Sequence, residues 1–462
     1  MELAVPKAIQ VDASTRTKPK NLFRLYDWEY LERSMHRLLA GWGRNFCEWD
    51  DKTAVHRHVW QTSECVKRLR KRVAEFPGGN LDVPVSARLE GFANAVLLAP
   101  SFEDALDGIY QEFAGALIHS YLMYIRSAHA IHDAPTIAIL QEILTIKEEE
   151  RLWFRSYRRK NPHTTDAAYL GKIQDEVNAL GHLLEAIPMP EGGEKAQPLG
   201  VRTDFRLRSR VGQPKDSERK HDIFPYLQTE FTRSAETRRL FWCYGYMLER
   251  NLADDQLAWI YDAHFMPWEF HEDISRHMWD ESRHGDSGHS RLLDFGITIQ
   301  DIGYAPYENL SEAEAVHKPL TPAELYERVF FIGMVAETGH FHVKREAYED
   351  FKEAGDFESA EMMLFDIVDE STHVQYAHRW LPVLAEKGAV VDHPTYRARA
   401  ATIRDEKQAA LLANVARYQK ELVFDEAKNP DHAFYRKLLR AIQERKPLAV
   451  RSPEPELSPL PM

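Results

Sequence analysis

Two short segments of this chain repeat one pair of residue types at one spacing, a glutamate followed three positions later by a histidine. The pairs are Glu281 with His284 and Glu370 with His373. A lone glutamate lies in an apolar run 32 positions before the first pair (Glu249) and 33 positions before the second (Glu337). One glutamate from each of two helices, plus Glu-x-x-His from each of two others, is the ligand set of a carboxylate-bridged pair of metal ions.

Each of the four glutamates lies in an apolar helical stripe that should turn towards the protein interior. The stripe around Glu281 includes Ile274, Met278 and Leu292, and the stripe around Glu370 includes Met363, Ile367 and Leu381. An ionised carboxylate is costly to bury unless it is paired or coordinates a cation. Four carboxylates in one interior would repel one another, and two divalent cations would neutralise them.

The chemistry of the donors narrows the choice of metal. A spacing of three residues places the glutamate and the histidine of each pair one turn apart on one helix face. Carboxylate oxygen and imidazole nitrogen suit iron, manganese or zinc. Thiolate ligands are not expected, because Cys243 lies six residues before Glu249 and off its face. The predicted metal ligands are Glu249, Glu281, His284, Glu337, Glu370 and His373.

Several nearby residues are weaker candidates. His340 lies one turn after Glu337 and His277 one turn before Glu281, but histidines so placed more often belong to the outer sphere of a site or to the surface. The same holds for His264, His271 and His289. Asp280 and Asp369 directly precede the paired glutamates, so their side chains should point about 100° away from the metals.

A metal-free helical scaffold would need other cations to satisfy the inward carboxylates. Lys344 lies two turns after Glu337 on the same face, and Arg283 lies on a face next to that of Glu281. Two cations would not neutralise four carboxylates, which favours the metal site.

Composition limits the class of protein. With 462 residues and a formal net charge of -13, the chain should have two or three domains and should not bind nucleic acid. Its mean hydropathy is -0.49, and neither a membrane span nor the apolar core of a secretion signal is visible. Three cysteines without a Cys-x-x-Cys pair fit a reducing cytoplasm.

Nearly every ordered segment is predicted to be helical, because β-branched alternation is absent and Gly and Pro fall mostly between the periodic runs. Eight main helices are predicted at 27–44, 50–75, 101–131, 135–160, 230–262, 267–294, 322–353 and 357–386. Further helices are predicted near 165–186, 393–423 and 431–445. Thr321 and Pro322 combine a helix cap with a first-turn proline.

These elements suggest a domain organisation. Proline-rich, charged and low-apolar stretches mark the linker and the ends of the chain. The expected segments are a disordered N-terminus (1–24), a helical bundle (25–186), a linker (187–225), a metal-binding bundle (226–390), C-terminal helices (391–446) and a disordered tail (447–462).

The two sets of four main helices resemble each other, in an order and spacing that favour an internal duplication. Tyr30-Leu31-Glu32-Arg33 resembles Met247-Leu248-Glu249-Arg250, and Arg57-His58-Val59-Trp60 resembles Arg276-His277-Met278-Trp279. The further correspondences are Thr62 for Glu281, Cys65 for His284, Glu112 for Glu337 and the run Glu148–Glu150 for Glu370. If Glu148 corresponds to Glu370, then Arg151 corresponds to His373, or Leu152 or Trp153 does if the register slides. We therefore expect the first bundle to be a copy that kept its fold and lost its metal, with an arginine cation in the metal's place.

The order Glu, Glu-x-x-His, Glu, Glu-x-x-His over residues 230–390 resembles the ferritin-like di-iron carboxylate superfamily. The resemblance implies an all-α fold, a four-helix bundle with one crossover. Together with the duplication, it implies two such bundles followed by C-terminal helices. It also implies two iron ions, although the same donors serve Mn/Fe or Mn/Mn, and the ligands Glu249, Glu281, His284, Glu337, Glu370 and His373.

The resemblance implies a di-metal oxidoreductase that activates O₂ to oxidise or oxygenate a small organic substrate, with no catalytic residue beyond the ligands. The expected partners are the substrate, O₂, an external electron donor and a second copy in a homodimer, without nucleic acid or membrane. The alternative is a ferroxidase-type or structural metal protein with no organic substrate. A duplicated chain with proline-rich loops fits a storage shell of small single-bundle subunits poorly.

Four glycines near the predicted ligands allow two interpretations. Gly245, Gly285, Gly288 and Gly333 lie on inward faces. Their lack of a side chain either leaves room for a ligand beside the metals or lets helices pack closely. Tyr244 or Tyr246, close to Glu249, could serve electron transfer.

Overall fold

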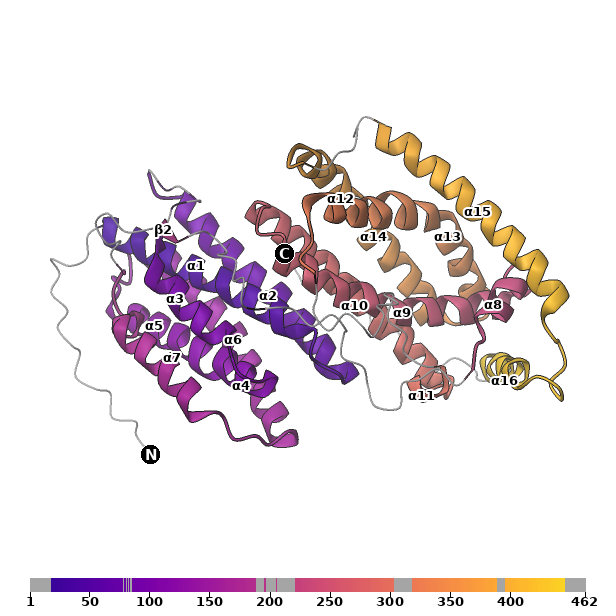
Figure 1. The fold of residues 1–462 in the computed structure, drawn as a ribbon, viewed down its shortest axis with the longest axis horizontal. Helices are drawn as coiled ribbons and strands as arrows, with labels where there is room; N and C mark the ends of the chain where they lie inside the picture. Colours follow the sequence, from indigo (N-terminus) through magenta and orange to yellow (C-terminus); the bar gives the residue numbers. More distant parts are fainter. Residues whose placement is uncertain are drawn as a thin grey trace, which may run out of the picture. The chain divides into compact units, whose positions relative to one another are not determined.

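The computed structural model describes residues 18–77, 79, 81, 83, 85–187, 195–196, 205, 221–302, 318–388 and 395–444. Apart from one antiparallel pair of two-residue strands, β1 (Val85–Ser86) and β2 (Lys195–Ala196), every regular element in these ranges is helical (Figure 1). The predicted all-α class is confirmed. Within the same ranges, no helix has both the length and the apolar character that crossing a bilayer requires.

The chain divides into two compact units. Unit 1 comprises Met1–Asn45 and Arg57–Leu207, and unit 2 comprises Phe46–His56 and Arg208–Met462. The division after Leu207 falls in the segment predicted to be a linker, most of which lies outside the described residues. The predicted disordered tail (447–462) and most of the predicted disordered N-terminus also lie outside them.

Unit 1 is built from short and long helices in the predicted places. Its elements are α1 (Lys18–Gly43), α2 (Trp49–Ala74, whose first residues belong to unit 2), α3 (Ala87–Leu97), α4 (Phe102–Asp107), the π-helical segment η2 (Gly108–Phe113), α5 (Ala114–Ser127), α6 (Ala134–Lys160), α7 (Ala167–Ala179) and the 3-10 turn η3 (Gly181–Leu183). Helix α1 begins at Lys18, inside the segment predicted to be disordered, and α3 lies between the predicted helices 50–75 and 101–131, where no helix was predicted.

Unit 2 follows the prediction more closely. Its elements are α8 (Phe224–Glu230), α9 (Ala235–Asp262), α10 (Trp268–Asp294), α11 (Ile299–Ile302), α12 (Pro322–Phe330), the π-helical segment η4 (Phe331–Glu337), α13 (Thr338–Glu353), α14 (Phe357–Glu386), α15 (Tyr396–Glu421) and α16 (Pro430–Glu444). The sequence predicted α10 and α14 to within one residue at each end.

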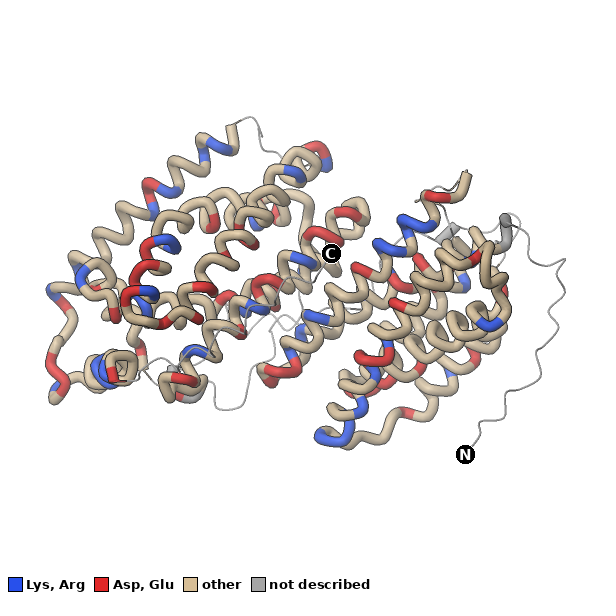
Figure 2. Tube along the Cα trace, turned by 180° about the vertical axis from the view of Figure 1, so that it is seen from behind, with Lys and Arg blue, Asp and Glu red and all other residues tan. Residues whose placement is uncertain are grey.

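Long helical segments of unit 2 form a ring around a shared interior (Figure 1). Helix α9 packs against α10, α10 against α14, α14 against the continuous run α12–η4–α13, and α13 against α9. Helix α15 lies outside this ring, against α8 and η4. Basic and acidic residues are interspersed along α15, as expected of a largely solvated helix (Figure 2).

The third segment of the ring begins as its sequence predicts and then departs from α-helical geometry. The Thr321 hydroxyl accepts from the Glu324 amide, and the Glu324 carboxylate accepts from the Thr321 amide, so the two form a capping box ahead of α12. From Phe331 to Glu337 the run widens into η4, whose last residue is Glu337. A π-helical segment changes the rotation per residue, and such segments often occur at functional sites.

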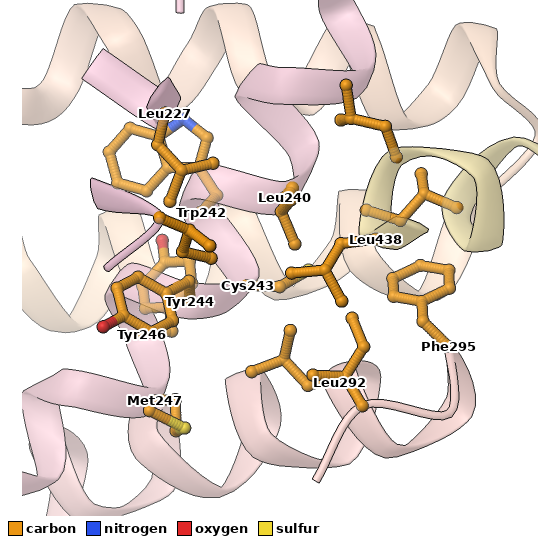
Figure 3. Close-up of a cluster of buried hydrophobic side chains, with 14 of the residues drawn as sticks. Leu227, Leu240, Trp242, Cys243, Tyr244, Tyr246, Met247, Leu292, Phe295 and Leu438 are labelled. Atoms are coloured by element: carbon orange, nitrogen blue, oxygen red, sulfur yellow. The ribbon is translucent and has the colours of Figure 1, made fainter. Parts of the chain in front are cut away.

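An apolar core joins α8 and α16 to the ring. Leu240 and Cys243 of α9 are fully buried among Leu227 of α8, Leu292 of α10 and Leu438 of α16 (Figure 3). This core fixes the end of α9 that leads to Glu249, so packing far from any charged group positions the first candidate ligand.

Leu240→Ala should therefore destabilise unit 2 by about 2–5 kcal/mol, because it removes a fully buried side chain and leaves a cavity. Leu412→Ala on α15, where 60% of the side chain is exposed, is the matched control and should change stability by less than about 0.5 kcal/mol. Urea unfolding followed by circular dichroism measures both. Equal shifts in the two variants would contradict the assignment of this core.

Candidate metal centre

Two helices of the ring each present three candidate ligands at the same spacing. On α10 the residues are His277, Glu281 and His284, and on α14 they are Asp366, Glu370 and His373. Positions i, i+4 and i+7 lie on one helix face, so each helix contributes a single stripe. Glu249 from α9 and Glu337 from η4 complete the set.

One end of this set, which we call group A, contains two histidines and two glutamates. Its members are His277, Glu281, Glu337 and His373, whose ligand atoms all lie within 4.8 Å of one another. The Nε2 atom of His277 is 3.1 Å from Oε1 of Glu281 and 3.1 Å from Oε1 of Glu337. The rings of His277 and His373 are stacked, with centroids 3.7 Å apart.

The other end, which we call group B, contains one histidine and more carboxylates. His284 Nδ1 lies 3.1 Å from Glu249 Oε2 and 3.4 Å from Asp366 Oδ1. Glu370 also gathers with Glu281 and His284. Oε1 of Glu281 faces group A and its Oε2 faces His284, at 3.9 Å. Glu281 is therefore placed to bridge the two groups.

Several buried atoms of the two groups form no hydrogen bond of good geometry, although imidazole nitrogens and carboxylate oxygens lie as close as 3.1 Å to one another. These buried atoms are Glu249 Oε2, His284 Nδ1, both carboxylate oxygens of Glu337, Asp366 Oδ1, Glu370 Oε2 and His373 Nδ1. Buried polar atoms are nearly always hydrogen-bonded, and an exception calls for a missing partner such as an ion. Because these atoms are carboxylate oxygens and imidazole nitrogens, the residues present could hold a metal ion such as iron, manganese or zinc.

Two aspartates each contact the Nε2 atom of one histidine of the centre. His373 Nε2 is 3.2 Å from Asp280 Oδ2, and His284 Nε2 is 3.3 Å from Asp369 Oδ2. Asp280 belongs to α10 and Asp369 to α14, so each aspartate supports the histidine of the facing helix. Such a carboxylate fixes the orientation of the ring and raises its basicity as a ligand.

The sequence predicted that these aspartates would point away from the metals, and within their own helix they do. Each aspartate contacts the histidine of the facing helix because α10 packs against α14. Periodicity within one helix does not predict a contact between two helices. Arg276 and Arg283 both pair with Asp280 and Asp369. The two arginines therefore balance the outer carboxylates.

Protonation of the centre follows from its burial and its charges. Burial raises the pKa of Glu249 to about 7 and the pKa of Glu370 well above its ordinary value. Burial opposes charging of His277, but the carboxylates of Glu337 and Glu281 outweigh it and raise its pKa to about 10. In the same way, Asp366, Asp369 and Glu249 raise the pKa of His284. Without metal, protons on these histidines balance the carboxylates.

All six residues predicted as ligands lie together in the structure. Two further members were not predicted. His277 was a weaker candidate ligand, for which an outer or solvated position was preferred, and Asp366 was not considered. Each lies four residues before a paired glutamate on its inward face, and that signal could have identified both. His340, by contrast, is exposed and belongs to neither group.

The structure separates the two interpretations of the glycines. A Cβ on Gly288 would lie 2.5 Å from the carbonyl oxygen of Cys243, and one on Gly285 would lie 3.0 Å from Cβ of Arg250. A Cβ on Gly333 would collide with Ala377. These three glycines therefore serve close helix packing. Only Gly245, one turn before Glu249, has no atom within 4 Å of an added Cβ.

Unit 1 has a buried lysine among its buried carboxylates. Lys147 Nζ lies 3.0 Å from Glu32 Oε2 and 3.4 Å from Glu150 Oε2, and all three side chains are fully buried. Lys147 also donates to the hydroxyl of Thr62 at 3.3 Å. Tyr121 donates to the other oxygen of Glu32 at 2.9 Å.

The lysine corrects the predicted correspondences in unit 1. Glu148 is exposed and Arg151 is only partly buried, so the inward face of α6 lies one position earlier than predicted. Glu112 is partly buried and accepts from Gln174, away from Glu32. The expected cation is therefore present, but Lys147 supplies it in place of Arg151.

We predict that the metal-free chain binds about two Mn²⁺ or Fe²⁺ ions, the number that a two-metal site holds. His277→Ala and Asp366→Ala should weaken binding about 10- to 100-fold or more, as should His284→Ala and His373→Ala.

Metal binding should also weaken as pH falls, because the metal must displace protons from His277 and His284. Elemental analysis and calorimetry measure these effects, with His340→Ala as the control. A chain that stays far below one ion under both iron and manganese supply would contradict the centre.

Lys147→Met should destabilise unit 1 by about 3–5 kcal/mol, because it leaves two buried carboxylates without a cation. Burial raises the pKa of Glu150 from 4.5 to about 7, so folding favours its proton and the contribution of Glu150 to stability falls as pH rises through this window. The loss in Lys147→Met should therefore be largest above pH about 7 and smaller near pH about 5. Urea unfolding at the two pH values tests this, with the exposed Lys160→Met as control. A loss independent of pH would argue against the buried carboxylates as its cause.

Residues 248–427 match the model of a family described as "Protein of unknown function (DUF455)", a region that contains every candidate ligand of unit 2. No curated protein and no solved structure matches the chain. The match covers less than half of the chain, and the family's description assigns no activity.

Proposed function

We propose that unit 2 is a ferritin-like four-helix bundle that holds two metal ions, iron in the first instance, and activates O₂ to oxidise or oxygenate a small organic substrate. The observation that supports this most strongly is the set of buried ligand atoms without hydrogen-bond partners. The candidate ligands as a whole come from all four segments of the ring, in the arrangement of one glutamate from each of two helices and Glu-x-x-His from each of two others.

The donor set favours a redox metal over a closed structural one. A structural zinc site has four protein ligands and no open position. Here three histidines and five carboxylates surround the interior, and carboxylate-rich sets suit iron and manganese. Two ferrous ions bound here would supply two electrons to O₂.

The chain's own residues would orient these ions and limit access to them. Asp280 and Asp369 fix the rings of His373 and His284, and Glu281 offers one oxygen to each group. Most ligand side chains are at most 5% exposed, which keeps bulk water from the centre. Glu249 is the exception, at 21%. With the open space beside Gly245, it marks the side of α9 as the route for small molecules.

We also propose that unit 1 is a duplicated bundle without metal. Both units have a long segment that widens into a π-helical stretch, η2 in unit 1 and η4 in unit 2. Both also place a glutamate of their first long helix in a buried polar interior, Glu32 on α1 and Glu249 on α9. Lys147 supplies in unit 1 the positive charge that metal would supply in unit 2.

Anaerobic loading of the chain with ferrous iron, followed by mixing with oxygenated buffer, tests the function. Ferric absorption should grow much faster than for free ferrous ion, and the rate should collapse in Glu281→Ala and Glu370→Ala, because both remove inward carboxylates. Glu361→Ala, exposed on the same helix as Glu370, is the control. Oxidation no faster than in buffer, or tight binding of zinc alone, would favour a structural metal site. Fast iron oxidation without oxidation of any organic compound would indicate a ferroxidase.

A further inference from the structure

The metal centre contains a buried lysine, Lys344, which is not one of the candidate ligands. Lys344 of α13 is 1% exposed, and its Nζ atom lies 2.6 Å from Asp366 Oδ2 and 2.7 Å from Glu370 Oε1. The ammonium also lies 5.6 Å from the centre of the Tyr246 ring. Tyr246 donates its hydroxyl to the same Oδ2 of Asp366 at 2.7 Å.

Lys344 divides the oxygens of its two partners into an outer and an inner one. Oδ2 of Asp366 and Oε1 of Glu370 are engaged by the ammonium. Oδ1 of Asp366 and Oε2 of Glu370 are buried without hydrogen-bond partners, and the former lies 3.4 Å from Nδ1 of His284. Because each carboxylate is held by one oxygen, the other stays directed towards group B.

Lys344 also sets the charge of the centre. The five inward carboxylates carry -5 when ionised, and the ammonium reduces this to -4, which two divalent cations cancel when the three histidines are neutral. These carboxylates are Glu249, Glu281, Glu337, Asp366 and Glu370. The remaining nearby acids, Asp280 and Asp369, are balanced by Arg276 and Arg283.

We propose that Lys344 is a positioning residue for the metal of group B, and that it tunes both metals towards their reduced, divalent state. It fixes Asp366 and Glu370 as ligands through their inner oxygens. Its permanent positive charge opposes the gain of further charge when the metals are oxidised. The inference rests on the proposed di-metal function, because it concerns how this chain binds and tunes those ions.

The opposite role would be competition, in which the ammonium occupies the place of the second metal in group B. The contacts favour positioning. A competitor would engage the oxygens that face His284 and Glu249, whereas Lys344 engages the oxygens on the other side of Asp366 and Glu370. The two roles predict opposite effects of removing the charge, so substitution separates them.

The experiment compares Lys344→Met, which removes the charge and the donor, with Lys344→Gln, which keeps a donor, and Lys344→Arg, which keeps the charge. Lys352→Met, on the same helix with about half of its side chain exposed, is the matched control. Metal-free chains are titrated with Mn²⁺ by calorimetry, and the midpoint potential of the iron-loaded chains is measured.

We expect Lys344→Met to weaken the second Mn²⁺ ion about 10- to 100-fold while the first binds as before, since losses of this size follow removal of outer-sphere partners. The midpoint potential should fall in Lys344→Met and Lys344→Gln and should recover in Lys344→Arg. A change in packing alone would not make the potential follow the charge in this way.

Three results would overturn the proposal: unchanged affinity with an unchanged potential, tighter binding of the second ion in Lys344→Met, or a potential in Lys344→Arg that matches Lys344→Met. If Lys344→Met does not fold, the comparison of Lys344→Gln with Lys344→Arg decides the role of the charge. A wild-type chain that binds no Mn²⁺ and no iron would instead refute the di-metal function itself.

Discussion

The cost of burying charge governs the structure of unit 2. Five carboxylates converge in the interior of a helical ring, where water cannot solvate them and each raises the energy of its neighbours. The described residues place one permanent cation, Lys344, among these five. The balance must come from protons on the histidines or from metal ions, so the centre couples the charge state of the interior to what it binds.

The helices meet this requirement through geometry that extends beyond each single helix. Stripes at i, i+4 and i+7 on α10 and α14 bring six donors into the interior, and η4 ends on Glu337, which adds another from the third segment. The apolar core around Leu240 and Cys243 holds α9, so that Glu249 completes the set from the fourth. The crossed pairs Asp280 with His373 and Asp369 with His284 tie α10 to α14 directly across the site.

Sequence periodicity predicted the all-α class, the bounds of α10 and α14, and six of the eight residues that gather in the centre. These features depend on the order of residues within one helix. Features that depend on the packing of two helices were not accessible in this way, and they include the crossed aspartates and the close-packing role of Gly285, Gly288 and Gly333. His277 and Asp366 are different, because their spacing from Glu281 and Glu370 was visible in the sequence. His277 was assigned to the outer sphere, and Asp366 was not considered.

The two units show two ways to satisfy a buried carboxylate. In unit 1, Lys147 lies between Glu32 and Glu150, and one ammonium serves two carboxylates. In unit 2, Lys344 has the same kind of partners, Asp366 and Glu370, but three more carboxylates surround it. One lysine therefore suffices for the two carboxylates of unit 1, whereas in unit 2 it contacts two carboxylates of five. On this view, the number of inward acids, more than the presence of a lysine, decides which interior requires metal.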